Sequence, residues 1–171
     1  MLDRQIFLIG MPGSGRHTLG RRAALELGLP FTDLEEWITL ATGRSVSEIG
    51  DQLGEDGLRR SEAAALSCLT RGRPGLIAVR PETPLTRENR GIMRSWGSLI
   101  LIERPLETIL ANFDAGKHPD VGENPEARLR EMDANWMPIY RKAADVCMPA
   151  WEDEEAVYAL LLRVLRERYH A

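Results

Sequence analysis

A glycine-dense segment, GMPGSGRHT at positions 10–18, carries the strongest chemical signal in the sequence. It follows a short apolar run, QIFLI at 5–9, and precedes apolar residues at helical spacing. The phosphate-binding loop pattern requires Gly, four residues, Gly, Lys and then Ser or Thr, between a strand and a helix. Its glycines let backbone N–H groups face an anion, and the positive end of the helix adds attraction. We therefore predict a phosphate-binding site formed by Gly10, Gly13, Ser14, Gly15, Arg16, His17 and Thr18.

Two residues of this segment depart from the pattern. Arg16 replaces the lysine and keeps its charge, but its planar fork cannot occupy the same point between two phosphates. His17 replaces the hydroxyl residue that would bind magnesium, a hard ion that prefers oxygen ligands. Thr18 remains as a phosphate donor. The segment thus favours an anion such as phosphate or sulfate over magnesium-nucleotide chemistry, and the alternative is a glycine-rich turn without a ligand.

Short apolar runs alternate with helical patterns along the chain, which predicts a parallel sheet covered by helices on both faces. The expected strands are residues 5–9, 29–32, 75–79, 98–102 and 144–148. The expected helices are residues 19–27, 34–41, 45–53, 58–69, 87–96, 106–113, 125–132, 137–142 and 153–169. Residues 115–124 are rich in Gly, Pro and charge, so we expect a mobile surface segment there.

Length and composition place the chain among globular proteins. Its 171 residues predict one domain spanning 1–171, and 43% hydrophobic with 28% charged residues is ordinary globular composition. A net charge of −4 argues against a nucleic-acid partner. The apolar runs are too short to cross a bilayer and there is no signal-peptide pattern, so we expect a cytoplasmic protein without a membrane partner. Cys68 and Cys147 lack paired spacing and are expected to be reduced core residues.

Together with the loop, several further segments make the chain resemble the shikimate kinase family over essentially its whole length. They are FTDLE at 31–35, TG at 42–43, GEDGLRRSE at 54–62, PIY at 138–140 and ADV at 144–146. Each is weak alone, but their order and spacing together are specific. The resemblance implies a three-layer α/β P-loop kinase-like fold with a five-stranded parallel sheet, and residues 113–124 as a lid candidate. With this family topology, we place the strand at 5–9 in the centre, flanked by 75–79 and the strand near Phe31.

The resemblance also implies an activity, the transfer of the γ-phosphoryl group of ATP to a ring hydroxyl of shikimate in aromatic amino-acid biosynthesis. Such transfer depends on positioning and charge neutralisation. The implied cofactors are Mg and ATP if the protein is active, with only phosphate or sulfate, or no ligand, as the alternative. In the implied site Arg16, Asp33 and Glu35 are catalytic, and Asp33 also binds the metal. Glu35, Arg59 and Arg80 bind the substrate.

Five further departures from the family pattern, one of them a triplet, fall where the chemistry takes place. RPE at 80–82 replaces a glycine triplet whose N–H groups approach the substrate, and proline has no N–H to donate. The arginines that in the family stack on adenine, belong to the lid and hold the substrate carboxylate are replaced by Asn112, His118 and Trp136. Glu35 stands for an aspartate and is one methylene longer. We therefore expect very weak or absent turnover, as in a pseudoenzyme.

Structural roles remain open for several of these residues. Asp33 can cap the helix that begins at Leu34, and Arg59 can form i,i+3 or i,i+4 pairs in a charged helix. Trp136 and Phe113 are expected to pack rather than stack on a base. The alternative function is a non-catalytic paralogue that binds an anion, a nucleotide or a protein partner. We expect a monomer with a small-molecule ligand, a nucleotide or shikimate.

Overall fold

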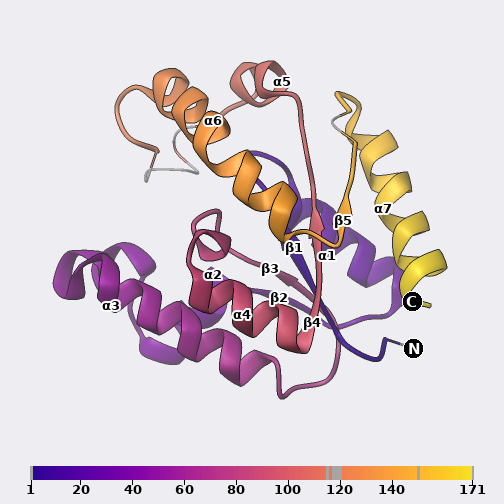
Figure 1. Cartoon of the computed structure of the whole chain (residues 1–171), viewed down its shortest axis with the longest axis horizontal. Coiled ribbons are helices and arrows are strands. Elements are labelled where there is room, and N and C mark those ends of the chain that lie inside the picture. Colours follow the sequence, from indigo (N-terminus) through magenta and orange to yellow (C-terminus); the bar gives the residue numbers. More distant parts are fainter. Residues whose placement is uncertain (1, 115, 117–120, 150, 171) are drawn as a thin grey trace.

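The computed structural model describes residues 2–114, 116, 121–149 and 151–170. Five parallel strands form a sheet in the order β2-β3-β1-β4-β5 (Figure 1). The strands are β1 (Gln5–Ile9), β2 (Phe31–Asp33), β3 (Leu76–Ala78), β4 (Gly97–Leu101) and β5 (Val146–Cys147). The predicted α/β fold with a five-stranded parallel sheet is therefore confirmed.

The central strand is β1, as predicted, but its second neighbour differs from the prediction. β1 pairs with β3 and β4, whereas β2 pairs with β3 at the edge of the sheet. The predicted place of the strand near Phe31 beside β1 is wrong. β3 is apolar and fully buried, while the residues of β2, including Thr32 and Asp33, are only half-buried. A strand with polar residues is easier to accommodate at an edge, and the apolar strand takes the inner position.

Helices connect the strands. They are α1 (Arg16–Leu27), α2 (Leu34–Thr42), α3 (Val46–Leu69), α4 (Arg87–Trp96), α5 (Leu106–Ala111), α6 (Pro125–Ala143) and α7 (Glu154–Tyr169), with a short 3-10 helix η1 (Thr83–Leu85). The predicted separation at Gly54 is present inside α3, where two helical stretches meet at a kink with non-helical φ of +69° and ψ of −179°, whereas the pair predicted at 125–132 and 137–142 is one helix, α6, that runs through Pro138. Gly54 adopts the left-handed conformation without a steric penalty, so the chain bends and the helix resumes. Among the described helices, none is both long and apolar enough to cross a membrane.

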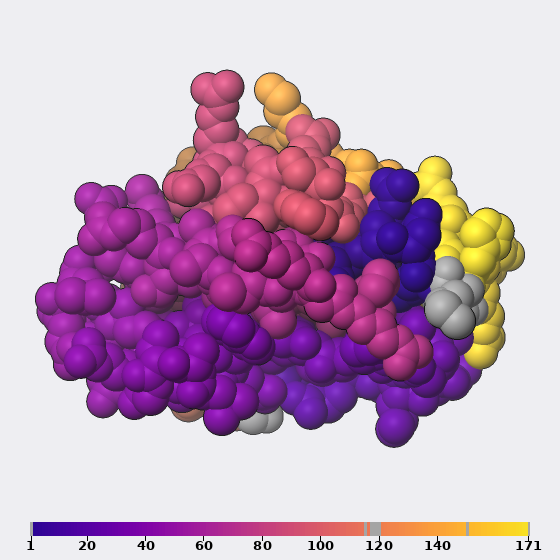
Figure 2. All heavy atoms as spheres, turned by 90° about the horizontal axis from the view of Figure 1, so that it is seen from below, coloured from indigo at the N-terminus to yellow at the C-terminus, as the bar shows by residue number. Residues whose placement is uncertain are grey.

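Alternate side chains of β1 point into two different core layers. Ile6 and Leu8 pack with residues of α1 and α7, whereas Phe7 and Ile9 pack with residues of α3, α4 and α6. All residues of β1 are buried, which explains the apolar run from Ile6 to Ile9, while the amide of the buried Gln5 is hydrogen-bonded to backbone groups such as the Gly75 N–H. Seen from below, α3 extends along one flank of the molecule, with α4 beside it (Figure 2). The sheet is thus fixed from both sides, and its carboxyl edge is the place left for ligands.

The two cysteines do not belong to the core. Cys68 and Cys147 are free and exposed, so the prediction that they are core residues is wrong. Cys68 lies near the carboxyl end of α3, on the side of the helix that faces solvent. Cys147 lies in β5, an edge strand whose two residues are not buried. An apolar sequence neighbourhood does not fix which face of an element a side chain occupies.

The lid candidate, residues 113–124, is only partly described. Its residues 115 and 117–120, His118 among them, lie outside the described part of the chain, and they make up half of the predicted mobile segment 115–124. Of the described residues, Val121 is buried in the core, and Phe113 packs against that core. Trp136 packs against the same cluster, so the packing predicted for both aromatic residues is confirmed.

We expect Gly97→Ala to lower the free energy of unfolding by about 1–3 kcal/mol, because its added Cβ would lie 2.3 Å from the carbonyl oxygen of Gln5 in β1. Gly50→Ala is the matched control. Gly50 lies in α3 with nothing within 4 Å of the Cβ position, so alanine should raise the same free energy by about 0.5–1 kcal/mol. Urea denaturation followed by circular dichroism measures both variants. Equal effects would contradict the close approach of β4 to β1.

Candidate active site

The carboxyl ends of β1, β2 and β3 bring the predicted site residues to one edge of the sheet. The segment 10–18 follows β1, Asp33 ends β2, and Arg80 comes shortly after β3. Parallel strands present their carboxyl ends on the same side, so segments far apart in sequence meet there. Arg59 reaches the same region from α3. The structure thus gathers the predicted residues around two adjoining stretches of surface, described in turn below.

The segment 10–18 keeps the backbone shape of an anion-binding loop. Gly15 is left-handed, with φ of +86°, and turns the chain into α1. A Cβ on Gly10 would lie 2.7 Å from the carbonyl oxygen of Ile102 and from Ser14 Oγ, so the close packing requires glycine. No side chain caps the amino end of α1, and the first helical bond runs from Leu19 N–H to the Gly15 carbonyl at 2.8 Å. The N–H groups of the first turn are therefore left for an anion.

The side chain of Arg16 is turned back onto the backbone. Its Nε donates to the carbonyl oxygen of Val79 at 2.7 Å, and one terminal nitrogen donates to the carbonyl oxygens of Met11 at 2.8 Å and Gly10 at 3.3 Å. Burial, which strips water from the guanidinium, lowers the pKa of Arg16 from its ordinary value. The guanidinium therefore ties the loop to the end of β3 and directs much of its donor capacity away from a ligand.

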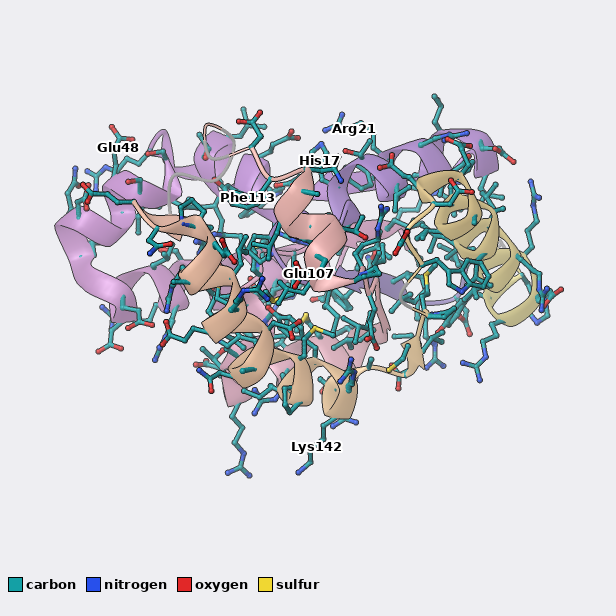
Figure 3. The ribbon with its side chains drawn as sticks, turned by 90° about the horizontal axis from the view of Figure 1, so that it is seen from above. His17, Arg21, Glu48, Glu107, Phe113 and Lys142 are labelled. Carbon is teal, nitrogen blue, oxygen red and sulfur yellow. The ribbon has the colours of Figure 1, made fainter. Side chains whose placement is uncertain are left out.

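His17 and Asp33 close the position where a magnesium ion would be expected. His17 Nδ1 donates to Asp33 Oδ2 at 2.7 Å, and His17 Nε2 accepts from Arg21 Nε at 3.3 Å. Because Nε2 accepts, the network assigns the proton to Nδ1. The ring also meets Phe31 edge-on, with centroids 5.5 Å apart. Figure 3 shows His17 and Arg21 close together on α1.

Asp33 uses both carboxylate oxygens within the chain. Oδ1 accepts the N–H groups of Glu35 at 2.9 Å and Glu36 at 3.1 Å, which makes Asp33 the N-cap of α2 and confirms the predicted structural role. Oδ2 accepts from His17. Among the described residues, no group of three or more His, Cys, Asp and Glu side chains is placed to hold a metal ion. These residues, as arranged, do not fit a magnesium ion, which prefers oxygen ligands in octahedral geometry.

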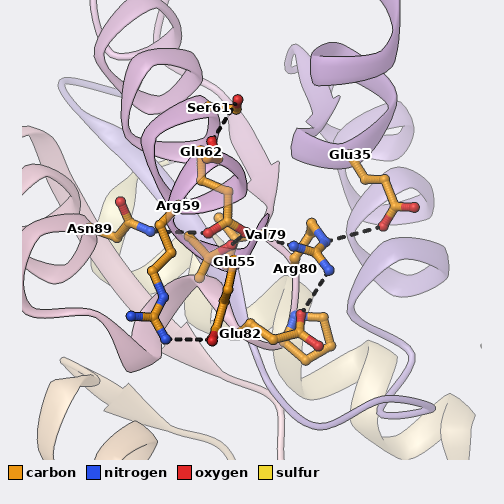
Figure 4. Close-up of polar contacts among 12 residues, drawn as sticks. Glu35, Glu55, Arg59, Ser61, Glu62, Val79, Arg80, Glu82 and Asn89 are labelled. Carbon is orange, nitrogen blue, oxygen red and sulfur yellow. Dashed lines mark hydrogen bonds and ion pairs between the residues drawn. The ribbon is translucent and has the colours of Figure 1, made fainter. Parts of the chain in front are cut away.

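Arg80 lies at the centre of three carboxylates (Figure 4). Its side chain is only 9% exposed. The distances from its guanidinium nitrogens are 3.0 Å to Glu62 Oε1, 3.3 Å to Glu82 Oε2 and 3.6 Å to Glu35 Oε2. Two residues predicted to bind substrate, Arg80 and Glu35, therefore lie within ion-pair distance of each other. In this arrangement the charge of Arg80 is balanced inside the chain.

Glu62 anchors this cluster and was not singled out from the sequence. Its side chain is 2% exposed and accepts from Arg80, from Thr83 Oγ1 at 2.9 Å and from Asn89 Nδ2 at 3.3 Å. Burial raises the pKa of the Glu62 carboxyl, while Arg80 and Thr83 act in the opposite direction. Asn89 is on the inner face of α4, so the cluster joins α3, α4 and the segment after β3. A partner eighteen or more residues away gives no local sequence signal.

Arg59 lies on an exposed turn of α3 and pairs with Glu55, one helical turn earlier, as the structural alternative predicted. Both line a cavity of about 320 Å³ together with Arg80, Arg128 and Trp136. The Arg128 guanidinium lies 5.9 Å from the Trp136 ring centroid. Sequence reasoning missed Arg128, although a spacing of eight residues on α6 places it on the face that carries Trp136. The cavity has room for a small acid, but three glutamates, Glu55, Glu62 and Glu82, line it together with the three arginines.

A second cavity, of about 610 Å³, adjoins the loop. It is lined by loop residues from Gly13 to Thr18 and by Arg104, Thr108, Asn112 and Glu152, among others. Arg104 was also missed by sequence reasoning; its side chain is 10% exposed and donates to the Glu152 carbonyl at 2.6 Å. The volume falls in the range of small-ligand sites, about 300–1,000 Å³. Loop and cavity together offer N–H groups and space for a phosphate-bearing ligand.

The parallel sheet and the glycine loop between β1 and α1 define an α/β protein of the P-loop kinase class. The family model for shikimate kinase matches residues 12–166. A shikimate kinase from Vibrio parahaemolyticus is 30% identical over 168 residues, which is 96% of this chain and 98% of that protein. One from Halorhodospira halophila is 37% identical over 83% of this chain and 81% of its own. The structure of an Acinetobacter baumannii shikimate kinase in complex with shikimate superimposes with a TM-score of 0.85 at 28% identity, covering 95% of this chain and 91% of that one. The chain belongs to the shikimate kinase family.

We expect Glu62→Gln to lower the free energy of unfolding by about 2–3 kcal/mol, because it removes a buried charge that faces Arg80. Glu55→Gln is the matched control, since it makes the same exchange at the exposed partner of Arg59 and should cost less than about 1 kcal/mol. Guanidinium denaturation monitored by tryptophan fluorescence compares them. A Glu62→Gln variant as stable as the control would show that the cluster does not hold this part of the fold.

Proposed function

We propose that this member of the shikimate kinase family transfers phosphoryl groups from ATP to shikimate very weakly or not at all. The observation that carries the proposal is the orientation of Arg16. Its hydrogen bonds to the carbonyls of Val79, Met11 and Gly10 hold the loop's cation against the backbone rather than toward a bound phosphate. In phosphoryl transfer the protein contributes positioning and charge neutralisation, so a misplaced cation acts directly on the rate.

The metal position supports the same conclusion. Phosphoryl transfer of this class uses a magnesium ion to neutralise charge on the transferred group. His17 supplies no hydroxyl, and Asp33 spends its oxygens on His17 and on the backbone of α2. Loss of a single stabilising cation costs about 10³ or more in rate. Two disabled positions at one phosphate site therefore place turnover far below the ordinary enzyme range.

The acid side of the site is also altered. The segment RPE at 80–82 is held rigidly, because Arg80 is surrounded by carboxylates and the Tyr140 hydroxyl donates to the Pro81 carbonyl at 2.6 Å. Pro81 offers no N–H to a substrate. The family's carboxylate-binding arginine is replaced by Trp136, which lines the 320 Å³ cavity. Arg59 and Arg128 also line it, but they are already paired with Glu55 and Glu131, so a carboxylate ligand would have to compete with these exposed glutamates.

The second candidate function is binding of an anion or nucleotide without catalysis. The observation that favours it is the loop itself, whose glycine-dependent shape and uncapped helix end do not require the missing lysine. The adjoining 610 Å³ cavity has room for more than a bare phosphate. A phosphate-bearing small molecule, bound without magnesium, satisfies both features. Slow product formation would point to a weak kinase, whereas ligand binding with no detectable product would point to the second candidate.

We expect turnover well below one per second with ATP, magnesium and shikimate at saturation, because the cations that stabilise the transferred group are misplaced. A coupled assay of ADP release by the purified chain measures this rate. A shikimate kinase of ordinary activity, run in parallel, controls for the coupling enzymes. Turnover near one per second or faster would overturn the proposal.

We expect the double variant Arg16→Lys/His17→Ser to gain magnesium-dependent affinity for ATP by about tenfold, because a lysine and a hydroxyl restore the loop pattern. Catalysis should lag behind binding, since the acid site stays incomplete. Calorimetric titration with ATP, with and without magnesium, makes the measurement. The matched control, Arg163→Lys/His170→Ser, carries the same exchanges in and after α7 and should leave affinity unchanged. If the loop variant gains nothing, the two departures do not limit magnesium-dependent binding of ATP.

A further inference from the structure

A groove lined by cations lies across the outer side of α4. This groove, of about 630 Å³, separates α4 from the carboxyl half of α6. Four cations line it: Arg87, Arg90 and Arg94 from α4, and Lys142 from α6. Its remaining lining is apolar or small, and no carboxylate contributes to it. In a chain with a net charge of −4, such a concentration of positive charge is a local feature.

Three of these cations have no partner within the described part of the chain. Arg87, Arg94 and Lys142 are exposed, and no ion pair or hydrogen bond of the described residues engages their side chains. Figure 3 shows Lys142 projecting away from the body of the protein. The adjacent Arg141, by contrast, pairs with Glu103 at 2.7 Å. The positive charge of the groove is therefore not neutralised by the described residues of this chain.

Arg90 has a different role in the same groove. It donates to the carbonyl oxygens of Pro84 at 2.7 Å and Leu85 at 2.8 Å. These bonds fix the amino half of α4 against η1, while Asn89 and Met93 on the opposite side of the helix are buried. These contacts attach α4 to the rest of the protein through its inner face. Its outward cations are not needed for packing.

A second hollow, of about 650 Å³, continues the surface on the other flank of α4. It shares Arg87 and Gly91 with the groove and adds Ile92, Trp96 and one carboxylate, Glu88. The Trp96 side chain is 51% exposed, which is unusual for a large aromatic residue. Gly91 forms the low point between the hollows, because a Cβ there would have no neighbour within 4 Å. An extended ligand has room to cross α4 at Gly91.

We propose that this surface, formed by Arg87, Gly91, Arg94, Trp96 and Lys142, docks an acidic amphipathic segment of a partner protein. Carboxylates of the segment would pair with the three free cations, and an apolar side chain would cover Trp96. Tryptophan and arginine are the residues that most often carry binding energy at protein interfaces. The apolar lining offers nothing to a hydrated polyphosphate, and the acidic net charge disfavours a nucleic acid.

The test uses a fluorescein-labelled peptide of glutamate and leucine at helical spacing, with binding followed by anisotropy. We expect saturable binding to the wild-type chain. Arg87→Glu/Arg94→Glu/Lys142→Glu should weaken it about tenfold or more, because the variant repels the carboxylates. Arg44→Glu/Arg60→Glu/Arg71→Glu makes the same change of charge at exposed positions on or beside α3 and should change it less than about twofold. No binding, or equal loss in both variants, overturns the proposal.

Two further variants separate docking from folding. Gly91→Gln replaces a helical glycine with a better helix former, so thermal stability should rise, yet its side chain occupies the crossing point and binding should weaken severalfold. Trp96→Ala should weaken binding with little effect on stability, since the residue is 51% exposed. Unchanged binding in both variants would overturn the proposal that the partner segment crosses α4 at Gly91 and covers Trp96. Tripolyphosphate or a single-stranded oligonucleotide binding as tightly as the peptide would also overturn it, in favour of a general polyanion site.

Discussion

The hydrogen bonds from Arg16 to backbone carbonyls are the interaction on which the site depends. A lysine at this position would present a compact ammonium that can turn toward a ligand. The guanidinium fork instead bridges carbonyls of the loop and of Val79, which follows β3, and so joins two strand ends. The loop keeps its shape, but its cation becomes part of the structure. The same residue type that preserves charge at this position removes its mobility.

The other charged groups of the site follow the same logic of internal pairing. His17 binds Asp33, Arg80 is surrounded by Glu35, Glu62 and Glu82, and Arg59 binds Glu55. A ligand that binds one of these charged side chains must therefore first displace the partner that the side chain has within the protein. Buried pairs resist displacement more than exposed ones, because breaking them leaves an uncompensated charge. The Arg80–Glu62 pair is the most resistant of these, and the exposed Arg59–Glu55 pair is the least.

The sequence predicts the helices and strands well, but it predicts the order of the strands and the long-range side-chain contacts poorly. Apolar runs and glycine stops mark elements such as β1 and α4, because both signals are local. The position of β2 at the edge of the sheet is set by which strand can bury both of its faces. The exposure of Cys147 is set by which face of its strand meets solvent. Neither can be read from a short stretch of sequence. The N-cap of Asp33 and the pair of Arg59 with Glu55 lie within four residues and were predictable. The bonds of Glu62 to Arg80 and Asn89 span 18 and 27 residues, beyond any local pattern.

The residues that hold the sheet and core together differ from the charged residues at the candidate site. The fold can therefore persist while the site residues change. The sheet rests on close approaches such as Gly97 against β1 and on two apolar layers, neither of which uses a residue of the loop's charged network. A charged substitution at the carboxyl edge of the strands is therefore compatible with an intact core, provided that it finds a partner nearby. Arg80 meets this condition through Glu62, and Arg16 meets it through backbone carbonyls. The helix α4 shows the same division on one element, because its inner face contributes Asn89 to the Glu62 cluster while its outer face carries Arg87 and Arg94, which the cluster does not use.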